Sequence, residues 1–144
     1  MSHAEVAQAA FKQHYNCAQA VLSAYAPELG LERGQALRLA TGFGGGMGRL
    51  AATCGVVTGA FMVLGLKYGM IDSADQASKE KTYAAVQAFA QEFTARCGSL
   101  NCRDLLGVDL STPSGLATAR DQQLFDRRCP MYLQAAAEIV DDLL

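Results

Sequence analysis

The sequence is poor in several residue types, and each shortage excludes a class of protein. It has no tryptophan, two histidines and three prolines among 144 residues. With so few histidines, no Ser/His/Asp or Cys/His catalytic arrangement can be argued. Charged residues make up only 18% of the chain, and the formal net charge is −2. This near-neutral balance argues against nucleic acid or an anionic membrane as the main partner.

Targeting and membrane-spanning signals are also missing. The first residues contain no basic segment followed by a continuous apolar run, so we expect no secretory signal and predict a cytoplasmic protein. The stretch 50–66 carries no charge. It is shorter than the roughly 20 residues that a membrane span needs. We therefore predict that it forms a helix buried at the centre of a bundle, with no membrane insertion.

Cysteine is the residue type that the sequence has in excess. The chain contains five cysteines, and hydrophobic residues make up 51% of it. A domain of this length buries enough apolar surface to fold without disulfides. In a reducing compartment, clustered cysteines more often indicate metal, cluster or redox chemistry than structural disulfides.

The pattern of caps and breakers predicts an all-α protein. Ser2 and Glu5 form a capping-box pattern that opens a first helix reaching about Tyr25. No convincing alternating strand is present. We predict one domain over residues 1–144, a compact helical bundle of about four longer helices plus short ones. The further helices are expected at about 31–40, 53–68, 74–96, 101–106, from Pro113, and from Cys129-Pro130 to the end.

Glycines give two further patterns. Gly55 and Gly59 fall on one face of the third long helix, which permits close approach of another backbone. Together with the apolar content, this face suggests a homodimer. The segment 41–48 holds five glycines in eight residues. Part of it formally matches a dinucleotide-binding fingerprint, but we reject that reading because no strand precedes it.

Three cysteines fall at predicted helix N-termini: Cys54, Cys102 and Cys129. Free N–H groups and the helix dipole at such positions favour thiolate over thiol, and thiolate is both the nucleophile and the metal ligand. Cys17 is expected in the middle of the first helix, on its apolar face. Cys97 ends the fourth long helix and forms a C-x4-C pair with Cys102, a spacing that is not specific for zinc.

The cysteine pattern resembles the C-GCAxxG-C-C family of redox-active proteins. The resemblance extends from about Tyr15 to Leu144, with valine at position 56 where the family usually has alanine. It rests on Asn16-Cys17-Ala18-Gln19, Gly44-Gly45-Gly46-Met47, Cys54-Gly55-Val56-Val57-Thr58-Gly59, Cys102-Arg103-Asp104-Leu105-Leu106-Gly107 and Cys129-Pro130. A related domain occurs in split-Soret cytochromes, where the cysteine region is linked to an iron–sulfur centre. The chain has no C-x-x-C-H motif, so haem does not carry over.

The resemblance implies that four cysteines form one site, with Cys97 outside it as a bystander or as a resolving thiol. The first hypothesis is an iron–sulfur cluster, most simply [2Fe–2S], on Cys17, Cys54, Cys102 and Cys129, serving electron transfer to an unknown partner or redox sensing. Gly45 and Gly46 would supply N–H groups beside the cluster.

Two alternatives remain open. The same four cysteines could hold zinc or copper without turnover. They could also perform cofactor-free thiol–disulfide chemistry, with Cys54 as an attacking thiol of lowered pKa and Cys102 as a candidate resolving partner.

The two histidines have weaker signals. His14 lies three residues before Cys17, so both fall on one helix face, but a structural role is favoured over metal ligation. His3 is expected in a frayed end.

Overall fold

The computed structural model describes residues 1–144, and helices account for nearly all of its regular structure. The only β-type pairing is a single antiparallel bridge between Thr53 and Asn101. The all-α prediction is therefore confirmed. The α-helices are α1 (His3–Lys12), α2 (Cys17–Tyr25), α3 (Arg33–Ala40), α4 (Gly44–Met47), α5 (Gly55–Tyr68), α6 (Gln76–Cys97), α7 (Cys102–Leu106), α8 (Pro113–Asp121) and α9 (Leu124–Leu143), and 3₁₀ turns cover Ala26–Leu29 and Thr41–Phe43.

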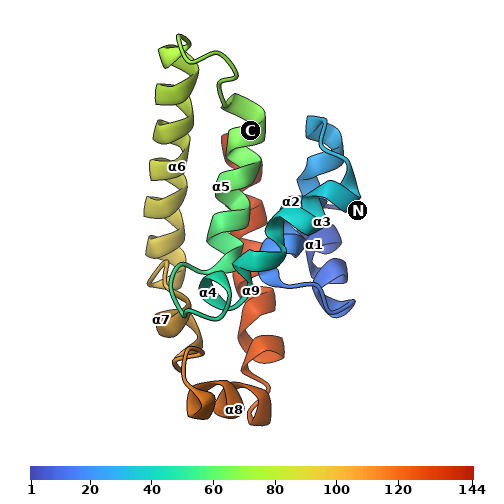
Figure 1. Ribbon diagram of the computed structural model, residues 1–144, viewed down its shortest axis with the longest axis vertical. Coiled ribbons are helices and arrows are strands. Elements are labelled where there is room, and N and C mark those ends of the chain that lie inside the picture. Colours follow the sequence, from blue (N-terminus) through green and yellow to red (C-terminus); the bar gives the residue numbers. More distant parts are fainter.

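Three long helices, α5, α6 and α9, run side by side and form the main column of the molecule (Figure 1). Helices α1, α2 and α3 lie along one side of this column, where α2 packs on α5 and α1 packs on α9. The short helices α7 and α8 close one end of it. The loop that contains α4 lies between α2 and α7, near that same end.

Local signals explain most helix ends. The Ser2 side chain accepts a hydrogen bond from the Glu5 N–H, and the Glu5 carboxylate accepts one from the Ser2 N–H, so the predicted capping box is present. Thr112 caps α8, whose first residue is proline. Gly98 and Gly107 end α6 and α7 in the left-handed conformation that glycine adopts without cost.

Helix α5 is the centre of the core. It is apolar on every side, and five of its side chains are fully buried: Val56, Val57, Ala60, Val63 and Leu64. Gly55 and Gly59 face α2 of the same chain; a Cβ on Gly59 would lie 2.9 Å from the Ala18 carbonyl oxygen. The close approach that these glycines predict is therefore made within the chain, so they no longer support a homodimer. No helix is long and apolar enough to cross a membrane.

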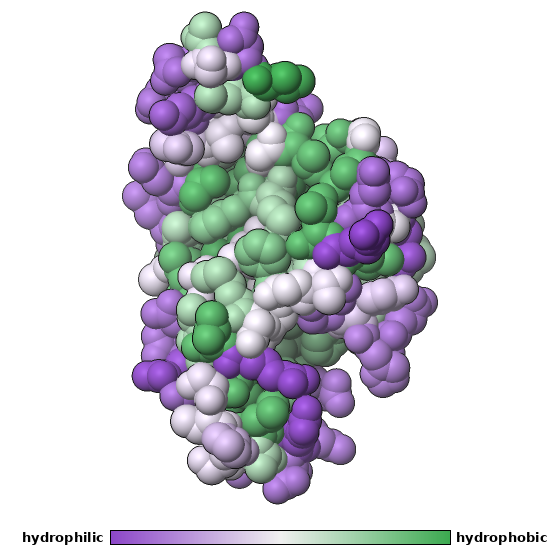
Figure 2. Space-filling view, viewed as in Figure 1, coloured by the Kyte–Doolittle hydropathy of each residue, from purple (hydrophilic) through white to green (hydrophobic).

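One face of the molecule carries an apolar surface. In Figure 2, hydrophobic residues gather over α5, between the polar outer sides of α6 and of the α1–α3 group. Leu39, Leu66 and Met70 are exposed, and Ile71 at the α5–α6 connection is fully exposed.

The expectation that His3 lies in a frayed end is wrong. Its ring stacks on Tyr25 with centroids 4.0 Å apart. Its Nδ1 and Nε2 atoms lie 2.8 Å from carboxylate oxygens of Asp141 and Glu28. Asp141 also accepts a hydrogen bond from the Tyr25 hydroxyl. These partners are distant in the sequence, so no local pattern indicates that the start of α1 is held to α9.

Candidate functional site

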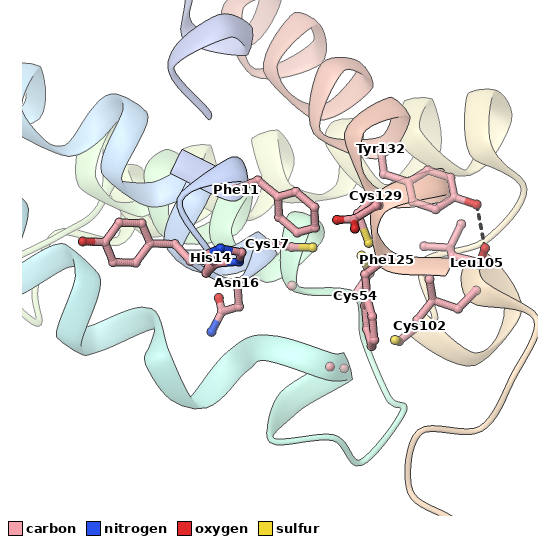
Figure 3. A pocket seen from close by; sticks show the side chains of 16 residues that line it. Phe11, His14, Asn16, Cys17, Cys54, Cys102, Leu105, Phe125, Cys129 and Tyr132 are labelled. Carbon is pink, nitrogen blue, oxygen red and sulfur yellow. Dashed lines mark hydrogen bonds between the residues drawn. The ribbon is translucent and has the colours of Figure 1, made fainter. Parts of the chain in front are cut away.

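The four cysteines of the predicted site line one cavity of about 310 Å³. The cavity lies at the end of the column where the α1–α2 turn, the glycine loop, α7 and α9 meet, and Figure 3 shows its side chains. Gly45 and Gly46 also line it; that they supply N–H groups to a cofactor stays a prediction. Its other lining residues are Phe11, His14, Tyr15, Asn16, Gly55, Leu105, Leu106, Phe125, Asp126 and Tyr132.

Cys17 lies at the start of a helix and not in the middle of one. The predicted first helix is two helices, because α1 ends at Lys12 and His14 adopts a positive φ of 75°. Asn16 then caps α2 through a reciprocal hydrogen-bond pair with Gln19, and Cys17 is the first residue of α2. The sequence contained this signal, since Asn-x-x-Gln is a variant of the capping box. The apolar spacing that continued across the break concealed it.

A short backbone pairing brings Cys54 and Cys102 to the same wall. The Cys54 N–H donates to the Leu100 carbonyl at 2.8 Å, and the Cys102 N–H donates to the Ala52 carbonyl at 2.7 Å. These two bonds flank the Thr53–Asn101 bridge. Cys54 is the N-cap of α5 and Cys102 the first residue of α7, as predicted within a residue. Side chains in this stretch alternate between two faces, so both cysteines point to the same face.

The glycine loop forms a left-handed turn behind Cys102. Positive φ values occur at Gly45, Gly46, Met47, Gly48, Arg49 and Ala51. Hydrogen bonds from Ala51 N–H to the Gly45 carbonyl and from Ala52 N–H to the Gly46 carbonyl hold it. Left-handed backbone costs about 1–2 kcal/mol for each non-glycine residue, so this turn is strained.

Gly46 is the residue of this turn that contacts the site most closely. Its φ is +71°, and an added Cβ would lie 2.7 Å from the Cys102 Cβ and 2.7 Å from the Ala52 nitrogen. Real Cβ atoms do not approach so closely, so only glycine lets the turn pack against Cys102 in this geometry.

Cys129 does not begin the last helix, contrary to the prediction. Helix α9 starts at Leu124, after Gln123 in a left-handed conformation, so Cys129 lies in its second turn. Pro130 lies inside the helix. Proline lacks the N–H that would bond to the carbonyl four residues earlier. A Cys-Pro pair is typical of a helix start, but here the proline lies in a helix that has already begun.

Burial governs the protonation of the thiols. Loss of solvent raises the pKa of Cys54 to about 12, although the nearby backbone N–H groups of Val56 and Val57 act in the opposite direction. Burial, together with nearby Cys129, raises the pKa of Cys102 to about 11. Burial therefore outweighs the effect expected of the helix N-termini, and Cys54 and Cys102 favour the thiol over the thiolate.

Cys17 and Cys129 are direct neighbours. The neighbouring Cys129 thiol is the largest cause that raises the pKa of Cys17, and burial adds to it. In Figure 3 the Cys17 sulfur is turned toward α9, the helix that carries Cys129.

Aromatic side chains and one hydrogen-bonded tyrosine frame the cavity. Phe11, Tyr15 and Phe125 are among the lining residues, and the Arg33 guanidinium lies 5.5 Å from the centre of the Tyr15 ring. The Tyr132 hydroxyl donates to the Leu105 carbonyl at 2.7 Å. This bond ties α9 to α7 beside the cysteines.

Two observations limit what the site holds. Cys97 is half-buried beside Met131 and Tyr132 in a separate hollow, as expected for a cysteine outside the site. No group of three or more His, Cys, Asp or Glu side chains is arranged to hold a metal ion.

The cavity and its cysteines fall within a segment that matches a known family model. Residues 15–143 match the model described as "Putative redox-active protein (C_GCAxxG_C_C)". The comparison with curated proteins and the comparison with solved structures gave no match. The matched range includes all four cavity cysteines and every helix from α2 to α9.

Proposed function

Because the chain belongs to the C_GCAxxG_C_C family of redox-active proteins, we propose that its four cavity cysteines bind an iron–sulfur cluster for electron transfer or redox sensing. The observation that carries the proposal is the convergence of Cys17, Cys54, Cys102 and Cys129 on one cavity. Four thiolates are the usual ligand set of such clusters.

The chemistry of the cavity fits a cluster better than a single ion. Most lining residues are apolar, and a cluster in an apolar, partly closed cavity is shielded from water. The ligands of one zinc ion must all lie about 2.3 Å from the same point. The four sulfurs are not gathered in that way. A cluster presents several metal atoms to its ligands, so it suits thiols distributed around a cavity.

The four cysteines would hold the bound cluster, and nearby backbone N–H groups would adjust its reduction potential. The cluster itself would supply one-electron chemistry. The Val56 and Val57 N–H groups lie at the start of α5 beside Cys54, and they act to lower the pKa of its thiol. N–H groups beside a ligand sulfur stabilise its negative charge and raise the reduction potential. Gly46 keeps the turn close to Cys102. All four thiols must lose their protons on binding, so we expect cluster uptake to release protons and to weaken at low pH.

The test is to measure iron, acid-labile sulfide and visible absorption in protein purified without oxygen, before and after reconstitution. We expect iron and sulfide to be present together and serine substitution of any cavity cysteine to reduce both. Cys97→Ser is the matched control, because Cys97 lies outside the cavity. A reconstituted protein with neither iron nor sulfide would refute the cluster, and zinc without sulfide would favour the metal–thiolate alternative.

A further inference from the structure

Two of the four cavity thiols are placed to react with each other. Cys17 begins α2 and Cys129 lies in α9, two helices that are in contact. Cys17 packs against the cluster of buried side chains that includes both Cys102 and Cys129. Both thiols line the same cavity, and Figure 3 shows the Cys17 sulfur turned toward α9.

The backbone pairing separates the other obvious candidates, Cys54 and Cys102. Thr53 lies opposite Asn101, so Cys54 lies opposite Leu100 and Cys102 lies opposite Ala52. Cys54 and Cys102 are thus diagonal neighbours across the bridge. Diagonal positions are about 7–8 Å apart in such a pairing. A disulfide needs Cβ atoms about 3.5–4.5 Å apart, so the bridge would have to open first.

We propose that, in the cluster-free protein, Cys17 and Cys129 form a disulfide when the cavity meets a low-molecular-weight disulfide. This inference rests on the proposed function and concerns the regulation of the same site. The bond removes two of the four ligands, so the oxidised protein does not take up a cluster. Reduction of the disulfide restores the binding site.

The reaction is a pair of thiol–disulfide exchanges. The Cys17 sulfur loses its proton and attacks one sulfur of the small disulfide, which forms a mixed disulfide and releases the first small thiol. The Cys129 sulfur then loses its proton and attacks the Cys17 sulfur, which releases the second small thiol. The two released thiols carry the two protons, the two cysteines are oxidised by two electrons in total, and the small disulfide is reduced by two.

Exposure sets the order of the two thiols. Cys17 is partly exposed, whereas Cys129 is buried with 5% of its surface accessible. A small disulfide that enters the cavity therefore meets Cys17 first, and Cys129 is the resolving thiol.

The experiment uses full-length, chelator-treated protein incubated with oxidised glutathione and then alkylated under denaturing conditions. Peptide mapping is expected to show a Cys17–Cys129 disulfide as the main product, with Cys54, Cys97 and Cys102 alkylated. Cys129→Ser is expected to stop at a mixed disulfide on Cys17, and Cys97→Ser should behave as the wild type does. Mapping of the wild type decides the pairing even if a variant fails to fold.

The second part adds ferrous iron and sulfide to the oxidised protein. We expect no cluster absorption until a reductant is added. A Cys54–Cys102 disulfide as the main product, or five free thiols after the incubation, would overturn the proposal. Full cluster uptake by the oxidised protein would overturn the regulatory part. If the Cys17–Cys129 disulfide forms but reduced protein takes up no iron or sulfide, the disulfide stands and the cluster proposal fails.

Discussion

Two glycines of α5 provide a controlled test of how closely α2 packs on the core. A Cβ at position 59 would lie 2.9 Å from the Ala18 carbonyl oxygen and 3.1 Å from the Val21 Cβ. The Ala18 oxygen belongs to the backbone, so α2 itself must move to make room. A Cβ at Gly65, on the same helix, would meet nothing within 4 Å.

The expected magnitude follows from comparing the two alanine variants. Each gains about 1 kcal/mol of helix propensity over glycine. Gly65→Ala keeps this gain, whereas Gly59→Ala also suffers overpacking, which costs about 1–3 kcal/mol. The propensity gain cancels between the variants, so their free energies of unfolding should differ by about 1–3 kcal/mol. For a chain of this size, 1 kcal/mol corresponds to roughly 2–4 °C in Tm.

The measurement is urea unfolding of both variants and the wild type by circular dichroism, with thermal scans as a second readout. We expect Gly65→Ala to be the most stable of the three proteins. If Gly59→Ala is as stable as Gly65→Ala, the contact between α2 and α5 is not as close as the structure shows, and the explanation for the glycine spacing fails.

Three further predictions concern other parts of the chain. Position 46 has a positive φ and no room for a Cβ. Gly46→Ala should therefore lower the free energy of unfolding by about 1–3 kcal/mol and reduce iron uptake. The rate at which Cys102 is alkylated should also differ from that in the wild type. Burial lowers the pKa of His3, but hydrogen bonds to the carboxylates of Glu28 and Asp141 outweigh burial, and the net pKa is raised. Protonated His3 therefore stabilises the folded protein fully below pH 6.5, and this stabilisation is lost as the pH rises through the folded-state pKa. The difference in Tm between wild type and His3→Gln should therefore shrink between pH 6 and pH 9, and a constant difference would contradict this. Pro130→Ala restores a helical N–H inside α9 and should raise the free energy of unfolding by up to about 3 kcal/mol in urea titrations, and a loss of stability would show that the proline is needed for packing.

Local chemistry predicted most of the helix ends, because caps and glycine stops act within a few residues. The ends of α6 and α7 at Gly98 and Gly107 and the start of α8 at Thr112 are of this kind. The same reasoning failed where two local signals competed. At Cys17 the apolar spacing concealed a capping box, and at Cys129 a proline typical of helix starts lies within a helix.

The candidate site was predicted less completely, because its geometry depends on contacts between distant segments. The resemblance to the family named the four cysteines, and their spacing alone did not. Nothing in the sequence indicated the bridge that joins the segment before α5 to the one before α7, or the contact between Cys17 and Cys129. The raised pKa values were also missed, since the helix-dipole argument considers only one end of a helix and not the burial of the whole cavity.

The separation of the four cysteines along the chain has a consequence for the order of folding. The site joins α2, the start of α5, α7 and α9, so its contacts close long loops of chain. Long loops are costly to close and form late relative to local helices. During synthesis, the three other cavity cysteines are made before Cys129. A nascent chain without α9 lacks part of the cavity wall. Loading of any cofactor must therefore follow synthesis of α9, which makes the docking of this helix the step that completes the site.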